Sequence, residues 1–319
     1  METRKLYYED PFQKGFATTV VSCDEVKGGY AVVLAETAFY PEGGGQPYDT
    51  GVLGEANVLE VHEKNGVITH LCDKPFEVGK SVSGKIDWAR RFDHMQQHSG
   101  EHICSGLICE RFHCDNVGFH MGADVVTIDF NADISWDELM EIEQLANLYI
   151  YEDHPIDIQF YRGAELDKVE YRSKKPLDGD VRIVSFPGAD CCACCGTHVV
   201  RSGQVGLVKF LSVQKFRDGV RIELLSGKRA HRYLSECWAQ DVRIAQALSV
   251  KPNASFAGVE RVLAELSALK QRCAKLEESV FAQTAAQYEG KGDVLLFEDE
   301  MSGDSLRKLC DAVTNHCGG

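Results

Sequence analysis

His98-Ser99-Gly100-Glu101-His102 lies within a segment, residues 87–112, whose apolar positions repeat with a helical period. Histidines four residues apart share one face of a helix, where their ring nitrogens can converge on a single metal ion. Ile103 and Leu107 continue the face that His98 begins, so burial is expected to anchor the pair. The segment therefore predicts a long, rigid helix that carries two metal ligands.

A second motif, Cys194-Cys-Gly-Thr-His198, repeats this spacing with a sulfur in place of one ring nitrogen. Its Gly-Thr interior favours a turn or a frayed helix end over the middle of a helix. Together the two motifs offer three imidazoles and one thiolate, a ligand set typical of tetrahedral zinc. We therefore predict one Zn²⁺ per chain, held by His98, His102, Cys194 and His198.

The length and the cysteine content limit the classes of protein to which this sequence can belong. The chain has 319 residues and a mass of 35.4 kDa, which predicts two or three hydrophobic cores. No basic segment followed by an apolar run opens it, and no run of about 18 apolar residues occurs. Its 13 cysteines are odd in number and cluster within residues 191–195, which favours reduced thiols and metal ligation over disulfides. The sequence thus predicts a soluble, cytoplasmic protein that does not bind membranes.

The formal net charge of −15 repels a polyanion overall, so any binding of nucleic acid must depend on local basic clusters. Such clusters occur between residues 172 and 232, on either side of the second motif, where the alternative for each is a solvated surface. They are Arg172-Ser-Lys174-Lys175, Lys215-Phe-Arg217 with Arg221, and Lys228-Arg229-Ala-His231-Arg232.

Residues 5–87 show short apolar or alternating runs separated by Gly and Asn, which predicts a small β-barrel or sandwich. Within this region, Thr37-Ala-Phe-Tyr-Pro-Glu-Gly43-Gly44-Gly45-Gln46 contains three consecutive glycines. Without side chains, the backbone N–H groups of such a loop can approach a phosphate, a ribose or a small substrate closely. The same stretch is also compatible with a tight turn that binds nothing.

The central region mixes both kinds of element. Residues 137–152 have the pattern of an amphipathic helix with Ser135 as its cap. Strand patterns occur at residues 125–130, 156–160, 181–186, 206–210 and 220–225. The fold class is therefore predicted to be α+β.

Strand patterns are absent from about residue 229 to 289, and a heptad seam of about three repeats appears instead. The seam is formed by Val259, Val262, Leu266, Leu269, Cys273, Leu276 and Val280. It predicts a coiled coil, either as a hairpin with the helix before Pro252 or with a second protomer in a homodimer. Beyond it, residues 293–297 resemble a strand and residues 304–315 a helix, too little for an independent domain.

The three motifs resemble, in this order, those of the freestanding alanyl-tRNA editing proteins (the AlaX type), relatives of the editing domain of alanyl-tRNA synthetase. Residues 37–46 resemble the glycine-rich motif of that family, and the other two motifs resemble its zinc motifs. The resemblance covers residues 5–230, and the helical seam is similar to the start of the C-terminal extension of the long form. Because the chain ends at Cys317-Gly-Gly, we expect its last domain to be truncated.

Four parts are predicted from this reasoning. They are a β-barrel domain with the glycine-rich motif (1–87), a zinc-dependent editing domain (88–230), a helical hairpin or coiled coil (231–289), and a strand-helix stub (290–319).

The resemblance implies hydrolysis of the ester that joins serine, and also glycine, to the terminal adenosine of tRNA(Ala). Zinc with four protein ligands has no open position, so it must lose a ligand, expand its coordination, or hold a water in place of one. Two roles for zinc stay open: it activates the water, or it orients the terminal ribose hydroxyls.

Individual roles are expected for residues beside the ligands. Glu101 is a candidate general base; alternatively, it forms a hydrogen bond to a ligand histidine or is simply solvated. Thr37 resembles the family hydroxyl that recognises the serine side chain. We further expect the substrate to contact Gly43, Gly44, Gly45, Gln46 and Thr197.

Two other functions fit parts of the pattern. His98-Ser-Gly-Glu101-His102 also satisfies the His-x-x-Glu-His motif of zinc peptidases, but that function would leave Cys194 and His198 unexplained. Alternatively, four protein ligands describe a closed structural zinc site in a non-catalytic tRNA-binding module. The neighbouring Cys191, Cys192 and Cys195 also permit a redox pair, although a reducing cytosol favours free thiols.

Overall fold

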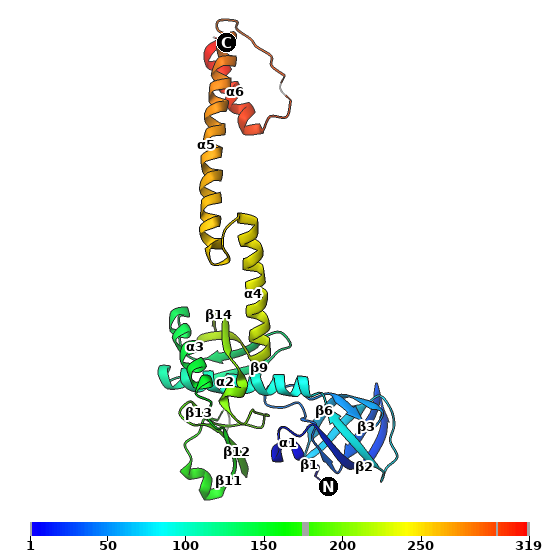
Figure 1. Ribbon diagram of the computed structural model, residues 1–319. Helices are drawn as coiled ribbons and strands as arrows, with labels where there is room; N and C mark the ends of the chain where they lie inside the picture. Colours follow the sequence, from blue (N-terminus) through cyan, green and yellow to red (C-terminus); the bar gives the residue numbers. More distant parts are fainter. Residues whose placement is uncertain (1, 174–178, 298, 318–319) are drawn as a thin grey trace. The chain divides into compact units, whose positions relative to one another are not determined.

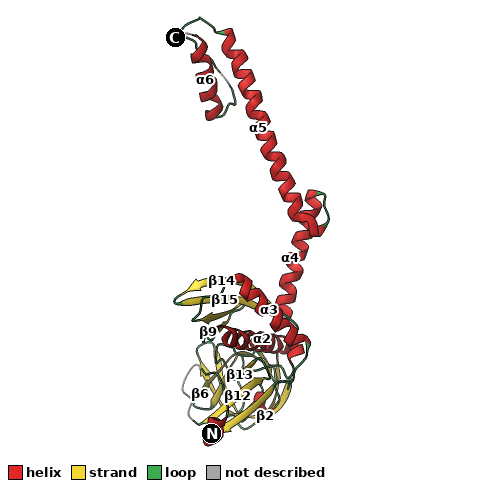
Figure 2. Ribbon diagram, turned by 90° about the vertical axis from the view of Figure 1, so that its left-hand side faces the viewer, coloured by secondary structure: helices red, strands yellow, loops and turns green. Residues whose placement is uncertain are grey.

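A computed structural model describes residues 2–173, 179–297 and 299–317. By its internal contacts the chain divides into two compact units, residues 1–234 and residues 235–319. The strands lie in the first unit, and the described residues of the second are helices joined by loops (Figures 1 and 2). The four-part division made from the sequence stays a prediction.

The N-terminal strands form a closed barrel in the order β2-β3-β7-β6-β5-β8. These strands are β2 (Gly15–Val26), β3 (Gly29–Leu34), β5 (Gly51–Leu53), β6 (Ala56–Lys64), β7 (Val67–Cys72) and β8 (Ser81–Ile86). Burial alternates along β7, as expected for strands with one face toward a core. A short helix, α1 (Leu6–Glu9), and a parallel pair, β1 (Arg4–Lys5) with β4 (Glu36–Thr37), adjoin the barrel.

The predicted helix over residues 87–112 is confirmed as α2 (Trp88–Phe112). The Asp87 side chain caps it by accepting a hydrogen bond from the Arg90 backbone N–H at 3.2 Å. Arg91 ties α2 to the barrel region, because its fully buried guanidinium pairs with the fully buried Asp49 carboxylate and donates to the Ala38 carbonyl. The beginning of α2 is therefore held against the barrel region.

Two antiparallel sheets complete the first unit together with α3 (Trp136–Tyr151), whose predicted Ser135 cap is present as a capping box with Glu138. The larger sheet has the order β14-β15-β10-β9, and the smaller has the order β11-β12-β13. The strands are β9 (Asn116–Met121), β10 (Val126–Phe130), β11 (Asp157–Arg162), β12 (Asp180–Phe186), β13 (Asp190–Ala193), β14 (Val208–Phe216) and β15 (Gly219–Ser226), with the 3₁₀ turns η1 (Gly163–Lys168) and η2 (Ser202–Val205). The predicted α+β class is confirmed, and α2, α3 and both sheets share one apolar core.

The later turns of α4 (Gly227–Leu248), the 3₁₀ turn η3 (Pro252–Ala254), α5 (Ser255–Gln287) and α6 (Gly303–Cys317) make up the second unit. The predicted helix over 304–315 is confirmed as α6. The predicted strand over 293–297 is wrong: these residues are irregular. Val294 and Leu296 pack against the α5–α6 core while Leu295 and Phe297 are exposed, so the alternation reflects contact with helices.

The heptad seam of α5 faces outward. Contacts between α4 and α5 lie at the turn that joins them, where Arg261 donates to the Leu248 carbonyl and Ser255 bonds to Asp241. The apolar seam residues are exposed between 38% and 58%, and the neighbouring Leu263 is 59% exposed. Pairing of this seam with a second protomer stays a prediction.

None of the helices in the described part of the chain is both long enough and apolar enough to cross a membrane.

Candidate metal centre

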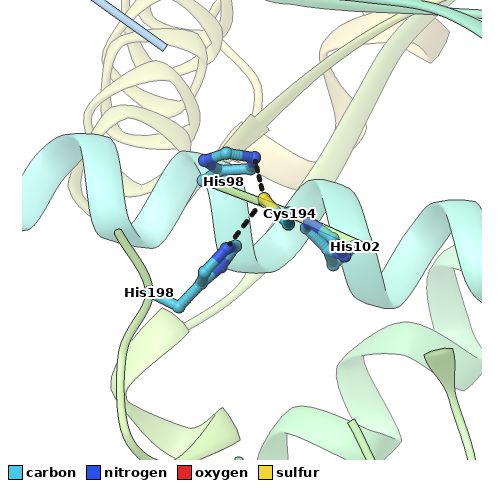
Figure 3. Close-up of side chains that lie close together, drawn as sticks. All are labelled: His98, His102, Cys194 and His198. Carbon is cyan, nitrogen blue, oxygen red and sulfur yellow. Dashed lines mark hydrogen bonds between the residues drawn. The ribbon is translucent and has the colours of Figure 1, made fainter. Parts of the chain in front are cut away.

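Two segments of the first unit bring four side chains together. His98 and His102 project from one face of α2, and Cys194 and His198 come from the segment that follows β13 (Figure 3). One ligand atom from each lies within 4.8 Å of every other. The Cys194 Sγ lies 3.5 Å from His98 Nε2 and 3.3 Å from His198 Nε2. The two motifs therefore meet at one centre.

The outer nitrogen of each imidazole has its own partner. His98 Nδ1 donates to Gln46 Oε1 at 2.9 Å, and His102 Nδ1 donates to Asp190 Oδ2 at 2.8 Å, since a carbonyl or carboxylate oxygen can only accept. Both rings therefore carry a proton on Nδ1, which leaves Nε2 as the nitrogen that a metal ion would bind. Such outer hydrogen bonds are the arrangement that fixes a metal-binding histidine.

The third histidine is held differently. Ser99 Oγ lies 3.3 Å from His198 Nδ1 and accepts a hydrogen bond from the Val199 backbone N–H at 3.1 Å. Ser99 lies inside the first motif, so α2 positions a ligand of the second motif as well as its own.

The electrostatics of the cluster favour a thiolate among imidazoles. Burial acts to raise the pKa of the Cys194 thiol, but His98 and His198 hold that pKa well below its ordinary value. Burial lowers the pKa of His198 well below its ordinary value. A thiolate and three imidazole nitrogens form a donor set that fits a cation accepting nitrogen and sulfur ligands.

Asp190 connects His102 to Arg172. The Arg172 guanidinium is bidentate on the carboxylate, with Nε–Oδ1 and Nη2–Oδ2 distances of 2.7 Å. Burial acts to raise the pKa of Asp190, but its hydrogen bonds with His102 and Arg172 hold that pKa below the ordinary value. The carboxylate is thus an ionised acceptor for His102. Lys174 and Lys175, which follow Arg172 in the predicted basic cluster, lie outside the described residues.

The glycine-rich motif forms a tight turn against this centre. The backbone groups of Gly43 and Gln46 bond to each other in both directions, and Gly44 and Gly45 have φ values of 60° and 87°. Gln46 bridges the motifs, because its Nε2 donates to Thr197 Oγ1 at 2.9 Å while its Oε1 accepts from the Thr197 backbone N–H at 3.0 Å. Gln46 and Thr197 therefore hold the ligand segments together.

Gly196 is required by packing. A Cβ added there would lie 2.1 Å from His98 Cε1, so any side chain would displace the first ligand. Phe119 of β9 stacks on the same ring, with centroids 5.0 Å apart.

A cavity of about 580 Å³ opens beside the cluster. It is large enough for a small ligand or the end of a longer one. The predicted residues Gly44, His98, Glu101, His102 and Cys194 line it, together with Val117, Gly118, Phe119, Arg172, Ser173, Asp180, Val181, Arg182, Cys192, Ala193 and Cys195.

Glu101 is buried at the edge of this cavity. Its Oε1 accepts from Ser105 Oγ at 2.7 Å and from Asn116 Nδ2 at 2.9 Å. Its Oε2 lies 4.0 Å from His102 Nε2, on the ligand side of the ring. One oxygen is thus anchored while the other faces the cluster.

Thr37 has a different position. It is fully buried, donates to His70 Nε2 at 2.9 Å and accepts from the Phe39 backbone N–H at 3.1 Å. It is not among the described residues that line the cavity. Recognition of serine by Thr37 stays a prediction.

Reasoning from the sequence did not identify Asp190 or Ser99. Only their positions in the sequence could have indicated them: Ser99 lies between the two histidines, and Asp190 directly precedes the cysteine cluster. All thirteen cysteines have free thiols, as the sequence predicted.

Two family models match parts of the chain. Residues 9–90 match the class II (A) tRNA synthetases, and residues 181–223 match the second additional domain of threonyl and alanyl tRNA synthetases. The second match contains Cys194 and His198.

Relatives cover nearly the whole chain. Alanyl-tRNA editing protein AlaX-L of Pyrococcus horikoshii is 31% identical, over 94% of this chain and 75% of its own length. Alanyl-tRNA editing protein Aarsd1-A of Xenopus laevis is 30% identical, over 89% and 73% respectively. Alanine–tRNA ligase of Pyrococcus abyssi is 36% identical over 98% of this chain, which spans only 36% of the ligase. The chain, with its motifs in one order around one cluster, belongs to the alanyl-tRNA editing protein family.

Proposed function

We propose that this protein is a hydrolase that removes a wrong amino acid from tRNA(Ala), cleaving the ester of seryl-tRNA(Ala) and of glycyl-tRNA(Ala). The observation that carries the proposal is the convergence of His98, His102, Cys194 and His198 beside an open cavity. Two alanyl-tRNA editing proteins align with most of the chain, which supports tRNA(Ala) as the substrate.

We further propose Zn²⁺ as the cation, one per chain. Three imidazoles and one thiolate suit zinc because it accepts mixed nitrogen and sulfur ligation. When bound, zinc supplies a Lewis-acid charge next to the ester carbonyl or the terminal ribose hydroxyls.

The residues of the chain then act on the ester. Glu101 Oε2 faces the cavity and accepts a proton from a water that attacks the carbonyl carbon. The bond between that carbon and the ribose oxygen breaks, and the ribose oxygen takes up the proton that Glu101 accepted, which leaves a free amino acid and an intact tRNA. Ser105 and Asn116 keep the carboxylate in place through its other oxygen.

The glycine turn serves binding in this proposal. Gly44 lines the cavity without a side chain, so the terminal adenosine can approach the backbone closely. Gly43, Gly45, Gln46 and Thr197 act by holding this turn against the ligand segments.

A peptidase function is less well supported. A peptidase of the His-x-x-Glu-His type would not need Cys194 and His198, yet their Sγ and Nε2 atoms belong to the same cluster. A non-catalytic tRNA-binding module is the second candidate, because four protein ligands can close a structural site.

Ester hydrolysis separates these functions. The zinc-loaded protein is incubated with seryl-, glycyl- and alanyl-tRNA(Ala), with and without a chelator, and the loss of ester is followed. We expect hydrolysis of the first two, little hydrolysis of alanyl-tRNA(Ala), and loss of activity with the chelator. Cys194→Ala should lose at least 100-fold, and Cys237→Ala, which changes an exposed thiol that does not line the cavity, should keep the activity. Tight tRNA binding without any ester hydrolysis would favour the non-catalytic module.

A further inference from the structure

We propose that a basic pocket one helical turn before His98 binds the phosphodiester backbone of the RNA, formed by Arg90, His94, Lys228, Arg229 and Arg232. The assignment to RNA rests on the proposed function. The pocket itself is separate from the cavity at the metal centre, since no lining residue is shared.

The pocket has a volume of about 410 Å³ and is built from several segments of the first unit. The beginning of α2 and the beginning of α4 supply its charged residues. The residue after Gln46 and the turn after β9 supply the remaining wall. Its lining residues are Pro47, Ala89, Arg90, Asp93, His94, Gly122, Ala123, Lys228, Arg229 and Arg232.

Its charge is opposite to that of the whole chain. Asp93 is the one carboxylate among the residues that line the pocket, and it forms an ion pair with Arg229. The Arg229 Nε and Nη2 atoms lie 2.9 Å and 2.7 Å from Asp93 Oδ2. Arg90, Lys228 and Arg232 form no ion pair with any carboxylate of the described residues. Three uncompensated cations thus surround one pocket in a protein whose net charge is −15, which is the local feature that binding to a polyanion requires.

Arg229 and Arg90 are held in position. Arg229 Nη1 donates to the Gly122 carbonyl at 2.7 Å, and Arg90 Nε donates to the Tyr48 carbonyl at 2.9 Å. These bonds fix both guanidinium groups before any ligand arrives, which lowers the entropic cost of binding.

His94 supplies an independent observation. Its side chain is 3% exposed, and no described residue supplies a hydrogen-bond partner for its Nδ1. A buried polar nitrogen without a hydrogen-bond partner is unfavourable unless a ligand supplies that partner. Burial, together with Arg90 and Arg229, lowers the pKa of His94 to about 3, so the neutral ring can donate one N–H to a phosphate oxygen without a second charge.

The location suits the end of an RNA chain. His94 precedes His98 by four residues on the same face of α2, a rise of about 6 Å at 1.5 Å per residue. Pro47 directly follows Gln46, which holds His98, and Gly122 follows the strand that carries Phe119. Lys228 and Arg232 are exposed, so the basic surface continues outward from the pocket, as a polymeric anion needs and a free phosphate does not.

The test measures binding of deacylated tRNA(Ala) to the full-length, zinc-loaded protein at several salt concentrations. Lys228→Ala and Arg232→Ala change exposed side chains and should leave the fold intact. We expect each to weaken binding by about 3- to 10-fold. Each should also reduce the slope of the logarithm of the binding constant against the logarithm of the salt concentration by about 1, the value for one phosphate contact. Arg243→Ala, an exposed arginine of α4 outside the pocket, is the matched control and should bind as the parent does.

A second measurement follows His94 directly. Its ring nitrogen signals in a nitrogen-15 NMR spectrum should shift when tRNA is added, and inorganic phosphate should compete only far above the tRNA concentration. Equal affinity and salt dependence in Lys228→Ala, Arg232→Ala and Arg243→Ala would overturn the proposal, as would an unchanged His94 spectrum. Competition by phosphate as strong as that by tRNA would overturn the assignment to RNA. Because deacylated tRNA is used, absence of ester hydrolysis would count against the proposed function alone.

Discussion

The Asp190 carboxylate is a positioning group on which the geometry of a ligand depends. It accepts from His102 Nδ1 and is itself fixed by Arg172. We expect Asp190→Asn to lower zinc affinity by about 10- to 100-fold, because the amide offers its carbonyl to only one of the two partners. Competition with a chromophoric chelator measures this affinity without reference to activity.

The control for that prediction is Asp153→Asn, which changes an exposed carboxylate paired with Arg201 at the surface. It should bind zinc as the parent does. Equal zinc affinity in the Asp190 and Asp153 variants would show that the hydrogen bond to His102 has no part in holding the ligand.

Glu101 is the other residue whose role can be isolated. Glu101→Gln keeps the size of the side chain and its carbonyl acceptor for Ser105 and Asn116, but removes the base. We expect ester hydrolysis to slow by about 10²- to 10⁴-fold while zinc content is unchanged. Glu110→Gln, an exposed change on the same helix, should have no effect. Full activity in Glu101→Gln would remove this carboxylate from the reaction.

Among the elements, strand β7 carries a buried histidine that links barrel stability to pH. His70 Nδ1 donates to the Val32 carbonyl, and its Nε2 accepts from Thr37, so the folded ring is neutral. Burial lowers the pKa of His70 to about 4 from its ordinary 6.5. The unfolded chain therefore binds the proton more readily, and this contribution to stability is complete above pH 6.5 and declines as pH falls toward 4.

From this shift, the free energy of unfolding should fall by about 2 kcal/mol between pH 7 and pH 5 through His70 alone. Urea unfolding of the parent and of His70→Gln at both pH values measures the difference, and the variant should lose the part due to His70. His62→Gln on the neighbouring strand β6 is the control, because that ring is exposed. The same pH dependence in parent and His70→Gln would contradict the prediction.

How far the elements follow from sequence depends on whether their signals are local. The i, i+4 spacing of His98 and His102 and the apolar face of α2 are local, and both the helix and the convergence of the rings could be predicted. The bonds from Gln46, Ser99 and Asp190 to the rings depend on how distant segments pack, which no periodicity reports. The alternation at residues 293–297 was misleading because apolar alternation also arises where a chain lies against helices.

At the scale of the whole molecule, a cation at the cluster would link α2 to the segment after β13 and so stabilise the first unit. A ligand that binds only the folded state adds about 4 kcal/mol of stability at 1,000 times its dissociation constant. For a unit of this size, that corresponds to a rise in Tm of roughly 10 °C. Thermal unfolding with saturating zinc and with excess chelator should show this difference in the parent and in Cys195→Ser. Cys194→Ser should lose most of the shift, because a hydroxyl is a poor replacement for the thiolate in this donor set. An equal zinc-dependent shift in Cys194→Ser and Cys195→Ser would mean that the ion binds elsewhere in the chain.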